Sequence, residues 1–309
     1  MSSVERELEV GTEAAGKRLD LFVGEALGLS RARVKRLFEE GTLRVDGRTA
    51  KKGQLVTAGQ KIRVTVVEED KAAVADLEVP LTVLREDPAL LFVDKPAGAP
   101  CHPLRPGETG TVANALIARY PECATASEDS REGGLCHRLD VETSGVLLAA
   151  RSRTAWEAMR RAFTDQAVDK RYLALVSGPL GDSGEVELPL RHHPRHADRV
   201  EPALEGEGGR DARSEFTVLA RRGDFSLVEV RIHTGVLHQV RAHLAAIGAP
   251  IVGDGLYGGR PQEGLGRFFL HARSLEVRHP ETGETIRVES PLPEDLQQAM
   301  QVVGISLPG

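Results

Sequence analysis

The sequence feature that most constrains the fold is a charged loop that runs directly into an apolar strand. The loop contains His137, Arg138 and Asp140, and a Thr-Ser-Gly turn signal separates it from the apolar residues 146–150. Apolar runs bounded by turn residues are typical of buried strands, and a buried strand can hold a polar loop in a fixed position. The local pattern leaves two interpretations open. Asp140 is either a reactive group or a turn residue that pairs with Arg138.

The same stretch resembles the signature of the RluA family of pseudouridine synthases. That signature reads His-Arg-Leu-Asp, two variable residues and Thr-Ser-Gly, followed by an aliphatic strand, and every fixed position is present here. The resemblance implies that Asp140 is the catalytic residue. It also implies that Arg138 fills the space of a uridine that has flipped out of the RNA, and it places His137 among the substrate-binding residues.

Two later segments extend the resemblance. Residues 170–176 match a Lys-x-Tyr-x-Ala-Leu-Val pattern, which implies that Tyr172 lies against the target base. Residues 234–243 match Thr-Gly-Arg-x-His-Gln-x-Arg-x-His, which implies that Arg241 pairs with the catalytic aspartate. Val236 replaces the first arginine of that pattern, which puts a contact with RNA or phosphate at this position in doubt.

The resemblance covers most of the chain, from about residue 16 to residue 295. Residues 248–258 match Gly-x-Pro-Ile-x-Gly-Asp-x-x-Tyr-Gly, and residues 94–98 match Asp-Lys-Pro-x-Gly. In the family the second of these segments is largely structural and lies near the active-site cleft. Lys95 is therefore not assigned to catalysis.

Charge is divided unevenly along the chain. Residues 16–67 hold 12 Lys or Arg against 5 Asp or Glu, a net charge of +7, so the other residues carry −13 for a total of −6. Apolar residues at helical spacing predict one helix at 19–27 and a second that begins after Ser30. The polar face of the second helix is basic and includes Arg31, Arg33 and Lys35.

This basic region resembles the small RNA-binding domain named for ribosomal protein S-four. The resemblance rests on Ser-Arg-x-Arg-Val-Lys at 30–35 and Gly-x-Leu-x-Val-Asp-Gly at 41–47. It implies RNA binding, because clustered cations bind phosphates with release of counterions, and it makes Arg31, Arg33 and Lys35 candidate contacts. The other interpretation is an ordinary solvated helix face.

The chain is long enough for one large domain or two domains. We predict a flexible segment at 1–15, an RNA-binding domain at 16–67, a linker at 68–80 and a catalytic domain at 81–309. The predicted fold class is α+β. A small helix–strand module precedes a mainly antiparallel mixed sheet that is flanked by helices.

Local patterns predict several further elements. A strand is expected at 54–56, and a helix is expected to begin at Ser152 and to reach Val168. Residues 189–213 are rich in Gly, Pro, Arg and Glu, which predicts a mobile, solvated loop.

Composition argues against several protein classes. The three cysteines, at positions 101, 123 and 136, are too widely spaced for a disulfide framework or a structural zinc site. No window holds the roughly 20 apolar residues of a membrane span, and the acidic N-terminus lacks a signal-peptide core. We therefore expect a cytoplasmic protein with no membrane partner. Motifs for nucleotide cofactors and HExxH metal sites are missing, so neither a cofactor nor a metal is expected.

The resemblance to the family implies a monomeric RNA pseudouridine synthase that acts on structured RNA, and together with the RNA-binding domain it favours large-subunit ribosomal RNA as the substrate. The reaction breaks the bond from ribose to a ring nitrogen and remakes it to a ring carbon. It needs a carboxylate at the sugar, and Asp140 suits either attack on the sugar or removal of a proton. The sequence does not identify the target uridine.

Three alternative functions stay open at this point. The first is a non-catalytic RNA-binding or ribosome-assembly protein that keeps the fold, for which Val236 is the support. The second is a pseudouridine synthase that acts on transfer RNA. The third is a metal-dependent hydrolase that uses the clustered histidines His192, His193 and His196.

Overall fold

The computed structural model divides the chain into an N-terminal unit, Met1–Asp70, and a C-terminal unit, Lys71–Gly309. It describes residues 2–29, 31–68, 73–196, 198–204 and 206–307. Each unit has its own hydrophobic core. Ser30, the predicted first cap of the second helix, lies outside the described residues.

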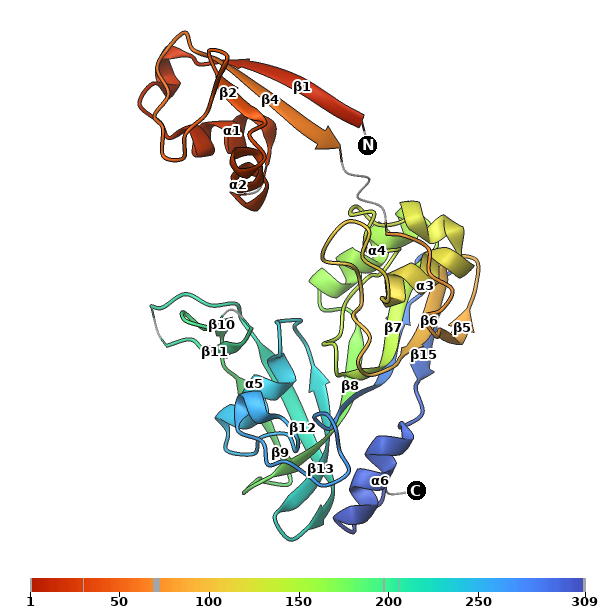
Figure 1. The fold of residues 1–309 in the computed structure, drawn as a ribbon. Helices are drawn as coiled ribbons and strands as arrows, with labels where there is room; N and C mark the ends of the chain where they lie inside the picture. The colour runs from red at the N-terminus through yellow and green to blue at the C-terminus, as the bar shows by residue number, and fades with distance from the viewer. Residues whose placement is uncertain (1, 30, 69–72, 197, 205, 308–309) are drawn as a thin grey trace. The chain divides into compact units, whose positions relative to one another are not determined.

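The N-terminal unit packs two helices on a four-stranded antiparallel sheet of order β1-β4-β2-β3 (Figure 1). Leu19, Val23, Val34 and Leu37 from the helices meet the inward side chains of the strands in one core. The elements are β1 (Ser2–Glu9), a 3-10 turn η1 (Thr12–Ala14), α1 (Leu19–Leu27), α2 (Arg31–Glu39), β2 (Leu43–Val45), β3 (Arg48–Thr49) and β4 (Lys61–Glu68). Both predicted helices are present.

The first strand of this unit corrects one prediction. Residues 2–9 form β1 and pair with β4 along its whole length, although the sequence predicted a flexible segment there. The acidic residues suggested a flexible segment, but in the structure they lie opposite basic residues of the partner strand β4. Glu7 lies within 3.3 Å of the Lys61 ammonium and within 3.0 Å of the Arg63 guanidinium. Cross-strand pairs of opposite charge favour this pairing.

The hairpin between β2 and β3 follows from its two turn residues. Asp46 and Gly47 both have positive φ values, +49° and +79°, as the tight two-residue turn of a β-hairpin requires. The strand predicted at 54–56 is wrong. In its place the structure has an isolated bridge between Arg18 and Leu55.

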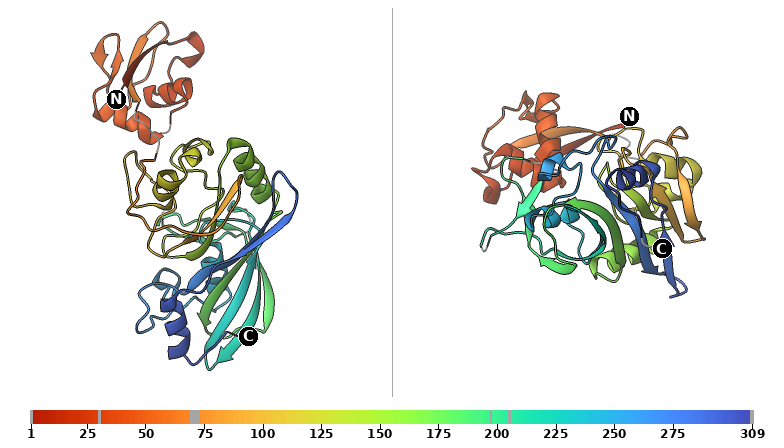
Figure 2. Two further views of the ribbon diagram at one scale, coloured as in Figure 1. Left: turned by 90° about the vertical axis from the view of Figure 1, so that its right-hand side faces the viewer. Right: turned by 90° about the horizontal axis from the view of Figure 1, so that it is seen from below.

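The C-terminal unit is built on a nine-stranded sheet of order β5-β6-β7-β14-β8-β13-β12-β9, with β15 paired to β14. Among the described strands only β7 and β14 pair in parallel, so the predicted mainly antiparallel mixed sheet is confirmed. The strands are β5 (Thr82–Glu86), β6 (Leu90–Lys95), β7 (Ser144–Ala150), β8 (Asp169–Ser177), β9 (Ser183–Glu187), β12 (Arg213–Arg222), β13 (Phe225–Ile232), β14 (Leu270–Arg278) and β15 (Thr285–Glu289). Figure 2 shows that the sheet curves along its length.

Helices cover the sheet of this unit from both sides. They are α3 (Val112–Arg119), α4 (Arg153–Thr164), α5 (Gln239–Ala246) and α6 (Glu294–Val302), with 3-10 turns η2 (Pro121–Thr125) and η3 (Gly255–Tyr257). Figure 1 shows α3 and α4 beside the β5–β7 end of the sheet, and α5 and α6 beside the β9–β13 end.

The apolar residues of β7 alternate between two separate cores. Leu147 packs with α3 in one core, whereas Leu148 packs with Trp156 of α4 in the other. A strand that is covered on both faces needs apolar residues at every position, because each face is shielded from water. This explains the uninterrupted apolar run that the sequence shows at 146–150.

Three further predictions for the C-terminal unit need correction. Of the predicted linker at 68–80, residues 69–72 lie outside the described residues, and residues 73–80 pack on α3 instead of running free. The Asn114 side chain donates to the Val74 carbonyl over 2.6 Å, and Ala73 and Val79 are buried. The helix that begins at the Ser152 cap ends at Thr164, before Val168.

The predicted mobile loop at 189–213 contains two short paired strands, β10 (Leu190–His192) and β11 (Val200–Pro202). Leu190, Val200 and Ala212 are buried in a small core of their own that includes Ala242 of α5. The polar composition of this segment had hidden these few apolar anchors. Among the described residues, every helix is too short or too polar to cross a membrane.

Candidate active site

Asp140 lies in the loop that enters β7, and the strand fixes the end of that loop. The backbone N–H of Thr143 donates to the carbonyl of Asp140 over 3.1 Å, which closes a tight turn. Gly145 has a φ of +118°, and a Cβ at this position would overlap the carbonyl of Ala272 on β14. The Thr-Ser-Gly pattern therefore lets the loop enter the sheet without a clash.

Lys95, the last residue of β6, holds the same loop from the other side. Its ammonium is fully buried and donates to the carbonyls of Pro96, Ala99 and Val141 over 2.9, 2.8 and 2.7 Å. Burial lowers the pKa of Lys95 to about 8. Because these three carbonyls accept from one ammonium, the residue after Asp140 is tied to the turn at 96–99.

Arg241 connects the Asp140 carboxylate to a second, buried carboxylate. Its Nη1 donates to Oδ2 of Asp140 over 3.1 Å, while its Nε and Nη2 donate to both oxygens of Asp254 over 2.6 and 2.9 Å. The guanidinium also lies over the rings of Phe268 and Tyr257, at 4.2 and 5.1 Å. Two-point hydrogen bonding and ring stacking fix the position of the cation, because the guanidinium is planar.

His238 approaches Asp140 from the N-terminus of α5. Its Nε2 lies 3.8 Å from Oδ2 of Asp140, and its Nδ1 is 3.1 Å from the hydroxyl of Tyr257. The residue has a left-handed backbone, with a φ of +52°, which is a strained conformation often found at functional sites. Burial lowers the pKa of His238, although the Asp140 charge opposes this shift.

Tyr172 lies on β8 and lines the same cleft as Asp140. The residue is 8% exposed, so a small part of its side chain is accessible from the cleft while the rest is packed in the core. Burial raises the pKa of Tyr172, and the nearby Asp140 charge raises it further. The hydroxyl therefore stays protonated at neutral pH.

The first two residues of the signature have different surroundings. Arg138 is exposed, and no hydrogen bond or ion pair to it is found in the described part of the chain. His137 is held locally, because its Nε2 accepts from the Leu148 backbone N–H over 3.0 Å and its ring stacks on Phe163 at 4.7 Å. Burial lowers the pKa of His137 to about 3, so the ring is neutral.

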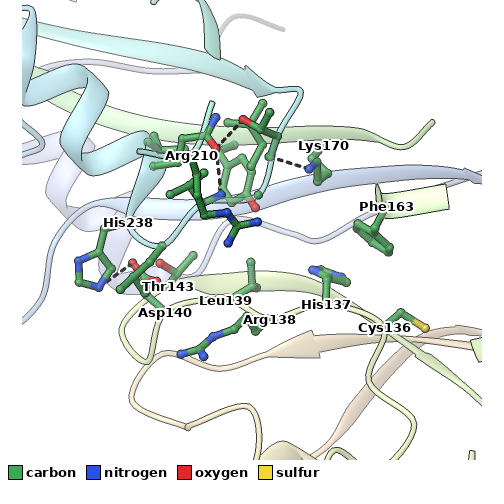
Figure 3. Close-up of a pocket in the computed structure, with 18 of the residues that line it drawn as sticks. Cys136, His137, Arg138, Leu139, Asp140, Thr143, Phe163, Lys170, Arg210 and His238 are labelled. Atoms are coloured by element: carbon green, nitrogen blue, oxygen red, sulfur yellow. Dashed lines mark hydrogen bonds and ion pairs between the residues drawn. The ribbon is translucent and has the colours of Figure 1, made fainter. Parts of the chain in front are cut away.

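One cleft of about 800 Å³ is lined by Asp140, Tyr172, Arg241, His238, Arg138 and His137. Figure 3 shows Asp140 and His238 at one end, Lys170 and Phe163 at the other, and Arg138 between them. Val236, the departure from the family pattern, also lines the cleft, and it packs against the small core that includes Leu190 and Val200. The structure thus brings Asp140, Tyr172, Arg241, Arg138 and His137 together.

The remaining predicted RNA contacts lie on α2 of the N-terminal unit. Arg31 and Lys35 are exposed and Arg33 is partly exposed, while Val34 and Leu37 of the same helix are buried. Lys35 lies 3.5 Å from Glu39, one turn along the helix, and Arg36 lies 3.9 Å from Glu40. Surface pairs of this kind are weak, so these cations can exchange an acidic neighbour for a phosphate.

Three site residues were not singled out from the sequence. Asp254 anchors Arg241, the Tyr257 hydroxyl contacts His238, and His238 contacts Asp140. The pattern at 248–258 contained Asp254 and Tyr257, but a Gly-Asp turn followed by an aromatic residue carries no chemical signal of its own. Only the three-dimensional contact with Arg241 reveals their part in the site.

The clustered histidines do not form a metal site. The Nδ1 of His193 accepts from the backbone N–H groups of Arg195 and His196 over 3.1 Å, and its ring packs against that of His196 at 4.7 Å. Within the described ranges, no group of three or more His, Cys, Asp or Glu side chains is arranged to hold a metal ion. The hydrolase alternative therefore has no ligand set there.

Comparisons with known proteins agree on one family. Residues 89–246 match the sequence profile of the family described as RNA pseudouridylate synthase. The chain is 37% identical to ribosomal large subunit pseudouridine synthase D of Xanthomonas campestris, over 96% of this chain and 92% of that protein. It is 38% identical to an uncharacterized RNA pseudouridine synthase of Chloroflexus aurantiacus, over 96% of this chain and 93% of that protein.

Solved structures show the same fold. Human RNA pseudouridylate synthase domain containing 4 superposes with a TM-score of 0.58 at 23% identity, covering 74% of this chain and 95% of that one. Human RNA pseudouridylate synthase domain containing 1 superposes with a TM-score of 0.55 at 25% identity, covering 76% of this chain and 99% of that one.

Proposed function

The chain belongs to the RNA pseudouridine synthases of the RluA type, and from that premise we propose that it isomerises specific uridines of large-subunit ribosomal RNA with Asp140 as the catalytic carboxylate. Relatives named ribosomal large subunit pseudouridine synthase D, from Xanthomonas campestris and Nitrosomonas europaea, align with nearly the whole chain. Their names support ribosomal RNA as the substrate over transfer RNA.

The observation that carries the proposal is the position of the Asp140 carboxylate. Its side chain is 18% exposed, so it can reach a bound molecule, yet it is held by a buried guanidinium that is 7% exposed. A charged group that is positioned by a fixed partner loses little energy in reorganisation when it reacts. This combination of access and fixed orientation is what a reaction at the ribose requires.

The reaction moves one glycosidic bond within a single nucleoside. The bond from the ribose to a ring nitrogen breaks, a bond to a ring carbon forms, and a proton leaves that carbon while the nitrogen gains one. Asp140 acts at the sugar, either by attack or by removal of a proton. Tyr172 supplies a flat face for the uracil and a protonated hydroxyl beside it.

The target base must leave its stack to reach Asp140, at a cost of a few kcal/mol. Arg138 is suited to offset that cost, because its long side chain is exposed in the cleft between Asp140 and His137. We assign Arg138 to the space that the uridine vacates. His137 then acts mainly by holding the loop, through its contacts with Leu148 and Phe163.

The N-terminal unit is proposed to bind structured RNA. Its basic helix presents Arg31 and Lys35 to solvent, and a local cluster of cations attracts phosphates. The acidic residues in 1–15 and 68–70 reduce the net charge of the whole unit to +1, so the attraction comes from the basic helix face. The protein would thus anchor the RNA with one unit and modify it with the other.

Two alternatives make different predictions in cells. A non-catalytic RNA-binding protein leaves every pseudouridine in place when it is removed, and a synthase that acts on transfer RNA alters transfer RNA alone. The test is to map pseudouridines in ribosomal and transfer RNA from cells without the protein, using chemical adducts that stop reverse transcription.

The expected result is the loss of one or a few stops in large-subunit ribosomal RNA. Wild-type protein should restore them, and Asp140→Asn should not, although it is made in equal amounts. Loss of stops in transfer RNA alone would transfer the proposal to that substrate. If no stop were lost in either RNA, the binding-protein alternative would replace it.

A further inference from the structure

One end of the cleft is not used by the proposed chemistry. This end lies on the opposite side of Arg138 from Asp140. It is lined by Lys170, Phe163, His137 and Arg160. Figure 3 shows Lys170 and Phe163 on the side of the cleft opposite His238. A role for this end of the cleft in RNA binding rests on the proposed function, because both concern the same substrate.

Lys170 is a buried cation whose charge is not matched. It is 6% exposed, its ammonium donates to the carbonyl of Thr234 over 2.9 Å, and it lies 5.8 Å from the centre of the Phe163 ring. Within the described ranges, no Asp or Glu side chain forms an ion pair with it. Burial lowers the pKa of Lys170 to about 8. An ammonium has three N–H donors, so at least one has no acceptor in the described part of the protein.

Comparison with Lys95 shows that this arrangement is unusual within the same fold. Lys95 is also buried, but three carbonyls accept from its ammonium and it does not line the cleft. A buried charge with too few partners is costly to folding. The fold keeps this costly charge at a cleft wall, where a bound anion could supply the missing partner.

Three titratable neighbours of Lys170 in the cleft, His137, Glu132 and Arg160, do not cancel its charge. His137 is neutral, because burial, Lys170 and Arg160 together lower its pKa to about 3. Glu132 is partly buried and interacts with Arg160, and burial raises the pKa of its carboxyl. Arg160 is exposed and adds a second cation. This end of the cleft therefore favours an anion.

The position of Lys170 relative to Tyr172 identifies which anion fits. The two residues are two apart on β8, so their side chains lie on the same face of the sheet and about 7 Å apart. The RNA backbone carries a phosphodiester group on either side of the flipped uridine, and Lys170 is a buried cation on the same strand as Tyr172, against which the uracil is expected to lie. We propose that the Lys170 ammonium binds a phosphodiester group of the RNA adjacent to the flipped uridine.

Phosphate ethylation interference tests this assignment and does not require that the target uridine be identified first. Large-subunit ribosomal RNA transcribed in vitro is sparsely ethylated on its phosphates, bound by the full-length protein, and the phosphates whose ethylation prevents binding are mapped. Wild type should show a set of interfering phosphates, one of which adjoins the modified uridine. Lys170→Met should lose interference at that phosphate alone.

A neighbouring residue provides a matched control. Arg171 is next to Lys170 on β8 but pairs with Asp169 and Glu229, and it does not line the cleft. Arg171→Gln removes the same charge and should leave the interference pattern unchanged. Lys170→Met should bind the RNA about tenfold more weakly, as expected for one charge-assisted hydrogen bond, with a salt slope lower by about 0.7 to 0.9.

Folding of the variant is checked by thermal unfolding. Lys170→Met should be at least as stable as wild type, because it removes an unmatched buried charge. Lys170→Gln keeps a donor for the Thr234 carbonyl without the charge, and it should lose interference at the same phosphate. An unaltered interference pattern and salt slope in whichever of these variants folds would overturn the proposal.

The outcomes separate this site from the proposed function. Pseudouridine formation is measured on the same RNA with wild-type protein. If pseudouridine forms but Lys170→Met shows the wild-type interference pattern, the phosphate site is wrong and the function stands. If no pseudouridine forms but Lys170→Met loses interference at one phosphate, the protein has a phosphate-binding site for RNA and the proposed function is wrong.

Discussion

Arg241 donates from Nη1 to Oδ2 of Asp140 over 3.1 Å, and this hydrogen bond joins two segments that lie 101 residues apart in the sequence. The guanidinium does not rest on Asp140 alone, because Asp254 accepts from its other two nitrogens. Asp140 is therefore oriented by the Arg241 guanidinium, and Asp254 holds that guanidinium in place. The proposed catalytic carboxylate thus depends on Asp254, a residue that does not line the cleft.

Asp254→Asn tests this dependence. Asn keeps the size of the side chain but loses the charge that holds Arg241, so we expect kcat to fall about 10- to 100-fold with little change in KM. The melting temperature should also fall, because a buried guanidinium loses a charged partner. Steady-state kinetics and thermal unfolding measure both effects. Asp224→Asn, at an exposed pair with Arg260, is the control. An unchanged kcat would exclude a positioning role for Asp254.

Arg138→Ala tests the space-filling role. The side chain is exposed and has no described partner, so the free energy of unfolding should not change. The value of kcat/KM should fall about 10- to 100-fold on RNA whose target uridine is stacked, since base flipping costs a few kcal/mol. On an RNA with the target in a flexible single strand, the loss should be smaller. Equal losses on both RNAs would contradict this role.

What the sequence could predict depended on whether a recognisable pattern contained the interacting residues. The Arg241–Asp140 pair, 101 residues apart, was expected only through the family resemblance. Asp140 and Arg138 share one loop, and their signature located the centre of the cleft. Asp254 and Tyr257 were missed because their contacts with Arg241 and His238 arise only when α5 and η3 come together. Local patterns contain no information about such contacts.

The N-terminal strand shows the same limit. Residues 2–9 are strongly charged, and their local composition predicted flexibility. Their partner, Lys61–Glu68, lies more than fifty residues away, and its charges complement those of β1. Register between distant strands depends on the partner sequence as well as on the strand itself. By contrast, the two helices of this unit depend on neighbouring residues and were predicted well.

Two buried histidines should make the protein sensitive to acid. Burial lowers the pKa of His137 to about 3 and that of His271 to about 4, from an unfolded value near 6.5. Below pH 6.5 these two histidines are protonated in the unfolded chain but stay neutral in the folded chain. The free energy of unfolding therefore falls as the pH decreases from 6.5 to 4. Each residue contributes about 1.4 kcal/mol per pH unit in this window.

Denaturant unfolding at several pH values measures that slope. His271 bonds Ser144 and the Ser290 carbonyl, and His271→Gln keeps a side chain able to make hydrogen bonds there. The variant should be less stable at pH 7 but should lose about 1.4 kcal/mol per pH unit less than wild type between pH 6.5 and 4. His196→Gln, at an exposed position, is the control. A slope identical to wild type in His271→Gln would rule out this origin of acid sensitivity.

We expect the basic helix of the N-terminal unit to affect the affinity for RNA but not the rate of the chemical step. Arg31 and Lys35 are exposed and one helical turn apart, so they can contact neighbouring phosphates together. Arg31→Gln with Lys35→Gln should lower the salt slope of RNA binding by about 1.4 to 1.8 and raise KM, while kcat at saturating RNA stays at the wild-type value. Arg153→Gln with Arg287→Gln removes two exposed charges from the C-terminal unit and serves as the control. A wild-type salt slope in the helix variant, together with a lower slope in the control variant, would contradict this prediction. The C-terminal unit would then anchor the RNA, and the basic helix would be an ordinary solvated surface.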